Sequence, residues 1–228
     1  MRIVRGSLVY LLVCAVLLTA ASAATKVHVI AFGKWTSVPW STGLETDDKP
    51  LTMKVRALVI DGRVKEYALG MPHEVTERLF VVRRAFRVND SLPEDSGPRW
   101  QWQRGGWLLV DRLTGHVSPI NLPEFDVFYS AASWYRDYVA YCGVADDGKK
   151  IFAIVAQISH RKPVLKKPLS NEGVAEDAGP DSACPPPLWQ RSPARVSFQS
   201  GYSAKLTFAI RGHVVDLVND AEEEEESK

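Results

Sequence analysis

Apolar and polar residues alternate in short runs along most of the chain, and Gly, Asp and Pro interrupt these runs. The runs are rich in β-branched and aromatic residues, and helical periodicity is hard to find after the N-terminal segment. Short alternating runs of this composition, separated by turn residues, are typical of β-strands. The pattern therefore predicts an all-β fold built from antiparallel strands.

The predicted strands group into meanders of three strands joined by short turns. Asp61-Gly62 and Gly105-Gly106 are expected to be two of these turns, and Asp-Gly between apolar runs is a strong hairpin signal. Further strands are expected at Leu79–Val88 and Phe125–Tyr129. The four predicted meanders cover residues 35–69, 99–120, 138–166 and 194–218.

The second turn of each meander falls near residue 62, 115, 160 or 212, at intervals of 53, 45 and 52 residues. Repeats of this length with several strands each are typical of propeller blades. The segment Trp134–Gln157, with Asp146-Asp147-Gly148-Lys149 between two apolar strands, is most similar to such a blade. The chain thus resembles secreted bacterial β-propeller-like repeat proteins, which implies about four blade-like units. An antiparallel β-sandwich or barrel also accounts for these strands.

Residues 1–23 have the features of a secretory signal peptide. Arg2 and Arg5 precede an apolar stretch, and Ala21-Ser22-Ala23 follows it as a small-residue cleavage site. A retained transmembrane anchor is the alternative, but the apolar stretch is shorter than the roughly 20 residues that cross a bilayer. We therefore predict cleavage near Ala23/Ala24 and a secreted or periplasmic protein with no membrane attachment after cleavage.

After cleavage, the chain is predicted to contain one all-β domain, residues 24–219, and an acidic tail, residues 220–228. Five consecutive glutamates in the tail repel one another and have few apolar neighbours to bury, so the tail is expected to be disordered. The Pro-rich stretch 168–187 is expected to be a long surface loop within the domain.

The charged residues and cysteines narrow the possible partners and cofactors. The chain has 28 basic and 27 acidic residues, so no overall positive field points to nucleic acid. Cys142 and Cys184 remain after cleavage, and an exported protein would join them in a disulfide. Two unpaired thiols are the alternative. No Cys/His set has zinc spacing, and neither a metal nor a cofactor is predicted.

Three tryptophans provide the most specific candidate for a binding site. Trp100 and Trp102 share one face of a predicted strand, Trp107 follows on the next, and Arg99 and Arg104 flank the pair. We consider these five residues as an aromatic platform for a sugar ring or an extended peptide. The alternative is that the rings fill the space between packed sheets, where large aromatic side chains contribute most to burial.

Catalytic motifs are weak throughout the sequence. His73-Glu74-Val75-Thr76-Glu77 begins like a zinc-protease motif, but Glu77 stands where the second histidine is required. Arg83 and Arg87 share a strand face and are expected at a solvated sheet edge. Asn89-Asp90-Ser91 matches an N-glycosylation sequon.

The sequence therefore favours an exported, non-catalytic binding domain. Its ligand would be a protein, a peptide or a glycan. The alternative is a hydrolase or metal-dependent enzyme whose site assembles from distant loops.

Overall fold

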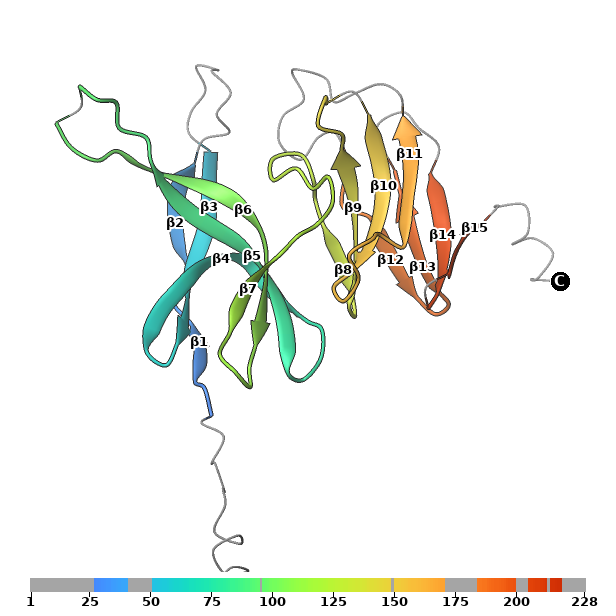
Figure 1. Ribbon diagram of the computed structural model, residues 1–228, viewed down its shortest axis with the longest axis horizontal. Coiled ribbons are helices and arrows are strands. Elements are labelled where there is room, and N and C mark those ends of the chain that lie inside the picture. The colour runs from blue at the N-terminus through green and yellow to red at the C-terminus, as the bar shows by residue number, and fades with distance from the viewer. Residues whose placement is uncertain are drawn as a thin grey trace, which may run out of the picture.

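A computed structural model describes residues 27–40, 51–94, 96–148, 150–170, 184–199, 205–212 and 214–218. All regular elements in this part of the chain are β-strands, which confirms the predicted fold class (Figure 1). The strands are β1 (Ile30–Phe32), β2 (Thr36–Trp40), β3 (Leu51–Ile60), β4 (Arg63–Glu74), β5 (Leu79–Asn89), β6 (Trp100–Asp111), β7 (Val117–Ile120), β8 (Ser133–Tyr135), β9 (Tyr138–Val144), β10 (Ile151–Gln157), β11 (Leu165–Ser170), β12 (Leu188–Arg191), β13 (Ala194–Phe198), β14 (Leu206–Arg211) and β15 (Val214–Val218).

Strands β1 to β7 form one sheet, in which five strands close a ring. The pairs β2–β3, β3–β4, β4–β5 and β5–β6 are antiparallel, and a parallel pairing of Trp40 with Trp102 joins β2 to β6. Strand β1 adds beside β3, and β7 adds beside β6. Asp61 and Gly62 form the predicted hairpin turn with φ angles of 51° and 75°, the left-handed conformation that such two-residue turns need.

The core of the β1–β7 sheet follows the alternation of its strands. In β3, Met53, Val55, Leu58 and Ile60 are buried, so the buried positions change from odd to even numbers between Val55 and Leu58. Strands β5, β6 and β2 complete this core with Phe80, Val82, Ala85, Leu108, Val110, Val38 and Trp40.

Strands β8 to β15 form two four-stranded antiparallel sheets, ordered β11-β10-β9-β8 and β12-β13-β14-β15. Figure 1 shows the two sheets packed face to face. Alternate residues of each sheet point into a shared core, as expected for an aligned sandwich. This core contains Ala140, Cys142, Ala153 and Val155 from the first sheet and Val196, Phe198, Phe208 and Ile210 from the second.

The β8–β11 sheet is buried on its other face too. Val139, Tyr141 and Ile154 point away from the sandwich core and pack against Leu122 and Phe125, which precede β8. Burial on both faces explains why β9 and β10 are continuous apolar runs rather than alternating ones. The Tyr141 hydroxyl donates a hydrogen bond of 2.7 Å to a backbone carbonyl in this segment, and burial raises the pKa of Tyr141.

Cys142 and Cys184 form the predicted disulfide. Their Cα atoms are 6.2 Å apart, both residues are buried in the sandwich core, and 42 positions separate them in sequence. Disulfides persist in oxidising compartments. The pair is thus in keeping with an oxidising, exported environment.

The four blade-like units are not shown. The described strands instead make one sheet of seven and two sheets of four, and two of these sheets pack as the sandwich that the sequence left as an alternative. Propeller spacing and this arrangement share the same hairpins, so the interval between turns does not distinguish them.

Three local expectations are corrected. Gly105-Gly106 is not a turn, because β6 runs through it; a Cβ on Gly105 would lie 3.0 Å from the Cβ of Arg84, so glycine permits a close strand approach. Residues 125–129 contain a turn at 127–129 and no strand. Strand β5 is not a solvated edge, since it pairs with β4 and β6, and Arg83 donates a 2.6 Å hydrogen bond to the carbonyl of Val127.

Several predicted segments lie wholly or mostly outside the described residues. These are the signal peptide 1–23, the acidic tail 220–228 and most of the Pro-rich stretch 168–187. The first three residues of that stretch end β11, and the domain boundaries 24–219 stay a prediction. The described part of the chain includes no helix long and apolar enough to cross a bilayer.

Candidate ligand-binding groove

The predicted tryptophan platform lies at the start of β6 and is only partly exposed. Trp100 is 57% exposed, whereas Trp102 is half-buried and packs edge-on against Tyr67 with 5.0 Å between ring centres. Arg87 pairs with Trp102 across β5 and β6, and its guanidinium lies 5.7 and 5.5 Å from the rings of Trp100 and Trp102. One cation therefore already contacts both rings.

The other three predicted residues have separate neighbours. Trp107 packs edge-on against Trp134 of β8 at 5.1 Å, and Arg104 lies 4.2 Å from the ring of the buried Trp40. Arg99 forms a 3.1 Å ion pair with a carboxylate just after β5. A binding role for these five residues stays a prediction, as does glycosylation of Asn89.

A groove of about 680 Å³ opens where the end of β4 meets β8 and β12. Strands β8 and β12 are the edges of the two sandwich sheets, and they contact each other (Figure 1). A volume of this size lies within the range of about 300–1,000 Å³ that is usual for ligand sites. The aromatic and charged residues that line the groove are His73, Glu74, Trp134, Tyr135, Arg136, Trp189 and Arg191.

Two ring pairs build the aromatic part of the groove. The imidazole of His73 stacks on Trp134 with 5.8 Å between ring centres and 25° between planes. Tyr135 lies beside Trp189, with 5.3 Å between ring centres and 30° between ring planes. The indole nitrogen of Trp189 donates a 3.0 Å hydrogen bond to the Ser133 carbonyl, which joins β12 to β8. Each pair thus combines residues from elements that are distant in sequence.

The turn after β8 presents Arg136 at the groove. Arg136 has a φ of 54°, a left-handed conformation that is uncommon for residues other than glycine. His73 holds this turn, because its Nε2 donates a 2.8 Å hydrogen bond to the Arg136 carbonyl. The Arg136 guanidinium lies 5.3 Å from the centre of the Tyr135 ring.

The acidic residue of the groove is already neutralised. Arg112 donates hydrogen bonds of 2.7 and 2.8 Å to the two carboxylate oxygens of Glu74. These bonds lower the pKa of Glu74 below its ordinary value, while partial desolvation acts in the opposite direction. The groove therefore keeps a net positive lining from Arg136 and Arg191.

No family model, curated protein or solved structure matches this chain. The chemistry of the groove must therefore be inferred from its side chains. Over the described ranges, no group of three His, Cys, Asp or Glu side chains could hold a metal ion. Among the described groove residues, no hydroxyl is hydrogen-bonded to His73 or Glu74, the contact by which a base activates a nucleophile. The arrangement is suited to binding.

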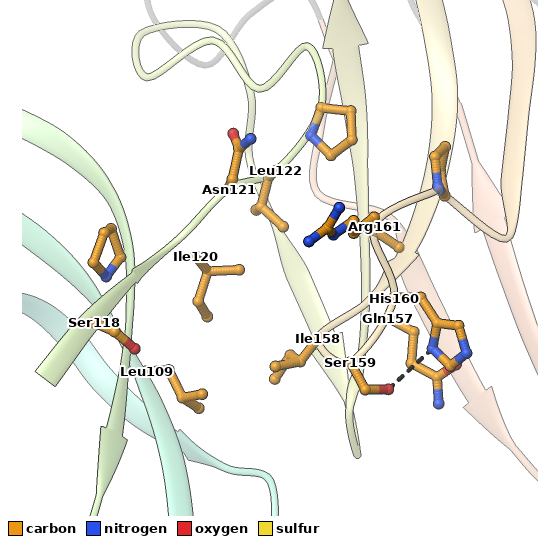
Figure 2. A pocket seen from close by; sticks show the side chains of 14 residues that line it. Leu109, Ser118, Ile120, Asn121, Leu122, Gln157, Ile158, Ser159, His160 and Arg161 are labelled. Carbon is orange, nitrogen blue, oxygen red and sulfur yellow. Dashed lines mark hydrogen bonds between the residues drawn. The ribbon is translucent and has the colours of Figure 1, made fainter. Parts of the chain in front are cut away.

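A second cleft, of about 470 Å³, lies between β7 and the turn after β10. Figure 2 shows Leu109 and Ile120 on one side and Ile158 and Ser159 on the other. The Ser159 hydroxyl is 3.0 Å from Nδ1 of His160, but the two residues are adjacent on an exposed turn. None of the described residues that line this cleft carries a carboxylate that could orient the imidazole.

The sequence pattern does not predict the groove, although it contains one relevant signal. Trp134-Tyr135-Arg136 and Trp189-Gln190-Arg191 are both Trp-x-Arg strings, and both line the groove. Trp102-Gln103-Arg104 is a third such string, and it lies on β6. The string alone therefore does not identify which copies meet, because that depends on how the sheets pack.

Proposed function

We propose that this protein is an exported binding protein that holds an extended ligand, without catalysis, in the groove between β4, β8 and β12. One observation carries the proposal: the Tyr135 and Trp189 rings lie together in an open groove beside two arginines. Aromatic side chains with a few well-placed polar groups are the usual lining of a ligand site.

Two further features support export. Residues 1–23 have the pattern of a secretory signal, and the Cys142–Cys184 disulfide suits a compartment outside the cytoplasm. We propose the secreted or periplasmic location on these grounds. The ligand would then be a protein, peptide or glycan met outside the cytoplasm, rather than a nucleic acid or a membrane.

The proposal is tested by screening the purified protein, without its predicted signal, against glycan and peptide arrays. Tyr135→Ala should weaken the binding found by about tenfold or more, because it removes a ring from the groove. Trp100→Ala is the matched control, since it removes an exposed ring from β6, outside the groove. Thermal melting of each variant separates lost binding from lost folding.

Two results would contradict the proposal. Binding that survives Tyr135→Ala and disappears with Trp100→Ala would move the site to the β6 tryptophans. Turnover of a substrate, lost on Ser159→Ala in a folded protein, would instead favour an enzyme at the second cleft.

A further inference from the structure

The charge of the groove points to the chemical class of its ligand. We propose that the groove binds an acidic glycan, a chain of sugar rings that carries carboxylates such as those of uronic acids. This inference rests on the proposed function and deepens it for the same groove. Three observations support it: the partners of the charged groups, the neighbouring rings and the backbone carbonyls that already accept side-chain hydrogen bonds.

The acidic groups near the groove accept hydrogen bonds from neighbouring side chains, while two exposed arginines have no carboxylate partner among the described residues. Both oxygens of Glu74 accept hydrogen bonds from Arg112, and the Asp137 carboxylate accepts a 2.6 Å hydrogen bond from a glutamine amide. Within the described ranges, neither Arg136 nor Arg191 forms an ion pair. A guanidinium binds a carboxylate through two parallel hydrogen bonds. A carboxylate of the ligand would therefore form an ion pair with Arg136 or Arg191.

The rings lie beside these cations. Tyr135 and Trp189 are 5.3 Å apart, and Arg136 lies over the Tyr135 ring. A pyranose ring has C–H groups on its faces and hydroxyls at its rim, so it packs against phenol and indole rings while its polar groups stay in water. A sugar ring that bears a carboxylate would use both kinds of side chain at once.

An extended peptide fits the groove less well, because three backbone carbonyls that border it already accept hydrogen bonds from side chains. A peptide that adds to a sheet needs free backbone groups on an edge strand. The carbonyl of Ser133 accepts from Trp189, the carbonyl of Arg136 accepts from His73, and the carbonyl of Arg191 accepts from Tyr135 at 3.5 Å. Side-chain recognition therefore remains as the means of holding a ligand.

The test compares three kinds of probe by isothermal titration. The first is a set of uronate oligosaccharides made from polygalacturonate, alginate and hyaluronate. The second is the same set after carboxyl reduction, which replaces each carboxylate with a neutral CH₂OH group. The third is hexaglutamate, an acidic peptide. At least one uronate oligosaccharide should bind, and its reduced counterpart should bind about tenfold more weakly or worse.

Variants assign the effect to the groove. Arg191→Gln combined with Arg136→Asn should weaken uronate binding by about tenfold. Asparagine is chosen because it tolerates the left-handed conformation at position 136. Arg211→Gln is the matched control, since it removes an exposed arginine of β14 that does not line the groove. Added salt should weaken the interaction of the wild type more than that of the double variant.

The outcomes distinguish the inference from the proposed function. Equal binding of uronate and reduced glycans, lost on Tyr135→Ala, would overturn the acidic class and leave groove binding intact. Tighter binding of hexaglutamate, lost with the double arginine variant, would replace the glycan with an acidic peptide. If no uronate binds, the inference is overturned. If a ligand found on the arrays binds equally well to the wild type and to every groove variant, both the inference and the proposed function are overturned.

Discussion

The two halves of the chain use their arginines and aromatic rings differently. In the β1–β7 sheet, arginines pack on rings of adjacent strands, as Arg87 does on Trp102 and Arg56 does on Phe32 at 4.0 Å. In the β8–β15 half, Tyr135 and Trp189 come from different sheets and line a groove with Arg136. Cross-strand pairs stabilise a sheet, whereas residues gathered from several sheets line a site.

This difference explains why a cluster of tryptophan and arginine residues in the sequence did not predict the position of the groove. The β6 segment contains three tryptophans within eight residues, and its rings contact cations or rings of the fold. The groove draws its rings from β4, β8 and β12, and the pair formed by Tyr135 and Trp189 exists only because β8 and β12 pack together.

The largest expected effect comes from removing the disulfide, which lies in only one of the halves. Cys142→Ala combined with Cys184→Ala should lower the free energy of unfolding by about 2–4 kcal/mol, since the bond closes a loop of 42 positions. Urea unfolding measures the loss. Hydrogen exchange should place it in β9, β13 and β14.

Reductant is the control for this variant, because it should destabilise the wild type and leave the double alanine protein unchanged. An equal loss of exchange protection in β5 and β6 would mean that the two halves unfold as one unit. That result would break the comparison between them.

A smaller effect should separate the two tryptophans of the predicted platform. Trp102→Ala removes a half-buried ring that packs on Tyr67 and should cost about 1–3 kcal/mol, whereas Trp100→Ala should stay within about 0.5 kcal/mol. Urea unfolding of both variants provides the measurement. Equal losses would show that Arg87 couples the two rings into one packed unit.

The smallest effect concerns acid sensitivity in the β1–β7 half. Arg78 donates a 2.8 Å hydrogen bond from Nε to Asp111, and this contact holds the pKa of Asp111 well below its usual value of 3.8. A lowered folded-state pKa stabilises the fold above the unfolded pKa, and the benefit disappears as the pH falls below it. Asp111→Asn should therefore lose less stability than the wild type between about pH 5 and pH 2.

Melting temperatures across that range measure the effect. Arg78→Gln should flatten the profile in the same way, because it removes the other partner of the pair. A steeper acid profile in either variant would contradict the assignment.

Sequence patterns predicted the local structure well, because the forces involved act over a few residues. The turn at Asp61-Gly62, the strand predicted at Leu79–Val88 and observed as β5 (Leu79–Asn89), and the apolar runs of β9 and β10 follow from turn chemistry and alternation. Gly105 was misjudged because glycine serves both turns and close strand contacts, and only the neighbouring strand distinguishes the two.

By itself, the sequence determined that the chain is all-β, where most hairpins fall, and that Cys142 has one partner. Tertiary structure decided the rest. The pairing of Trp40 with Trp102 closes the ring, and the packing of β8 beside β12 brings Tyr135 to Trp189. Alternation determines which face of a strand is buried. It does not determine which sheet covers that face, because any apolar surface can do so. Only the packing of the whole chain selects which sheets meet.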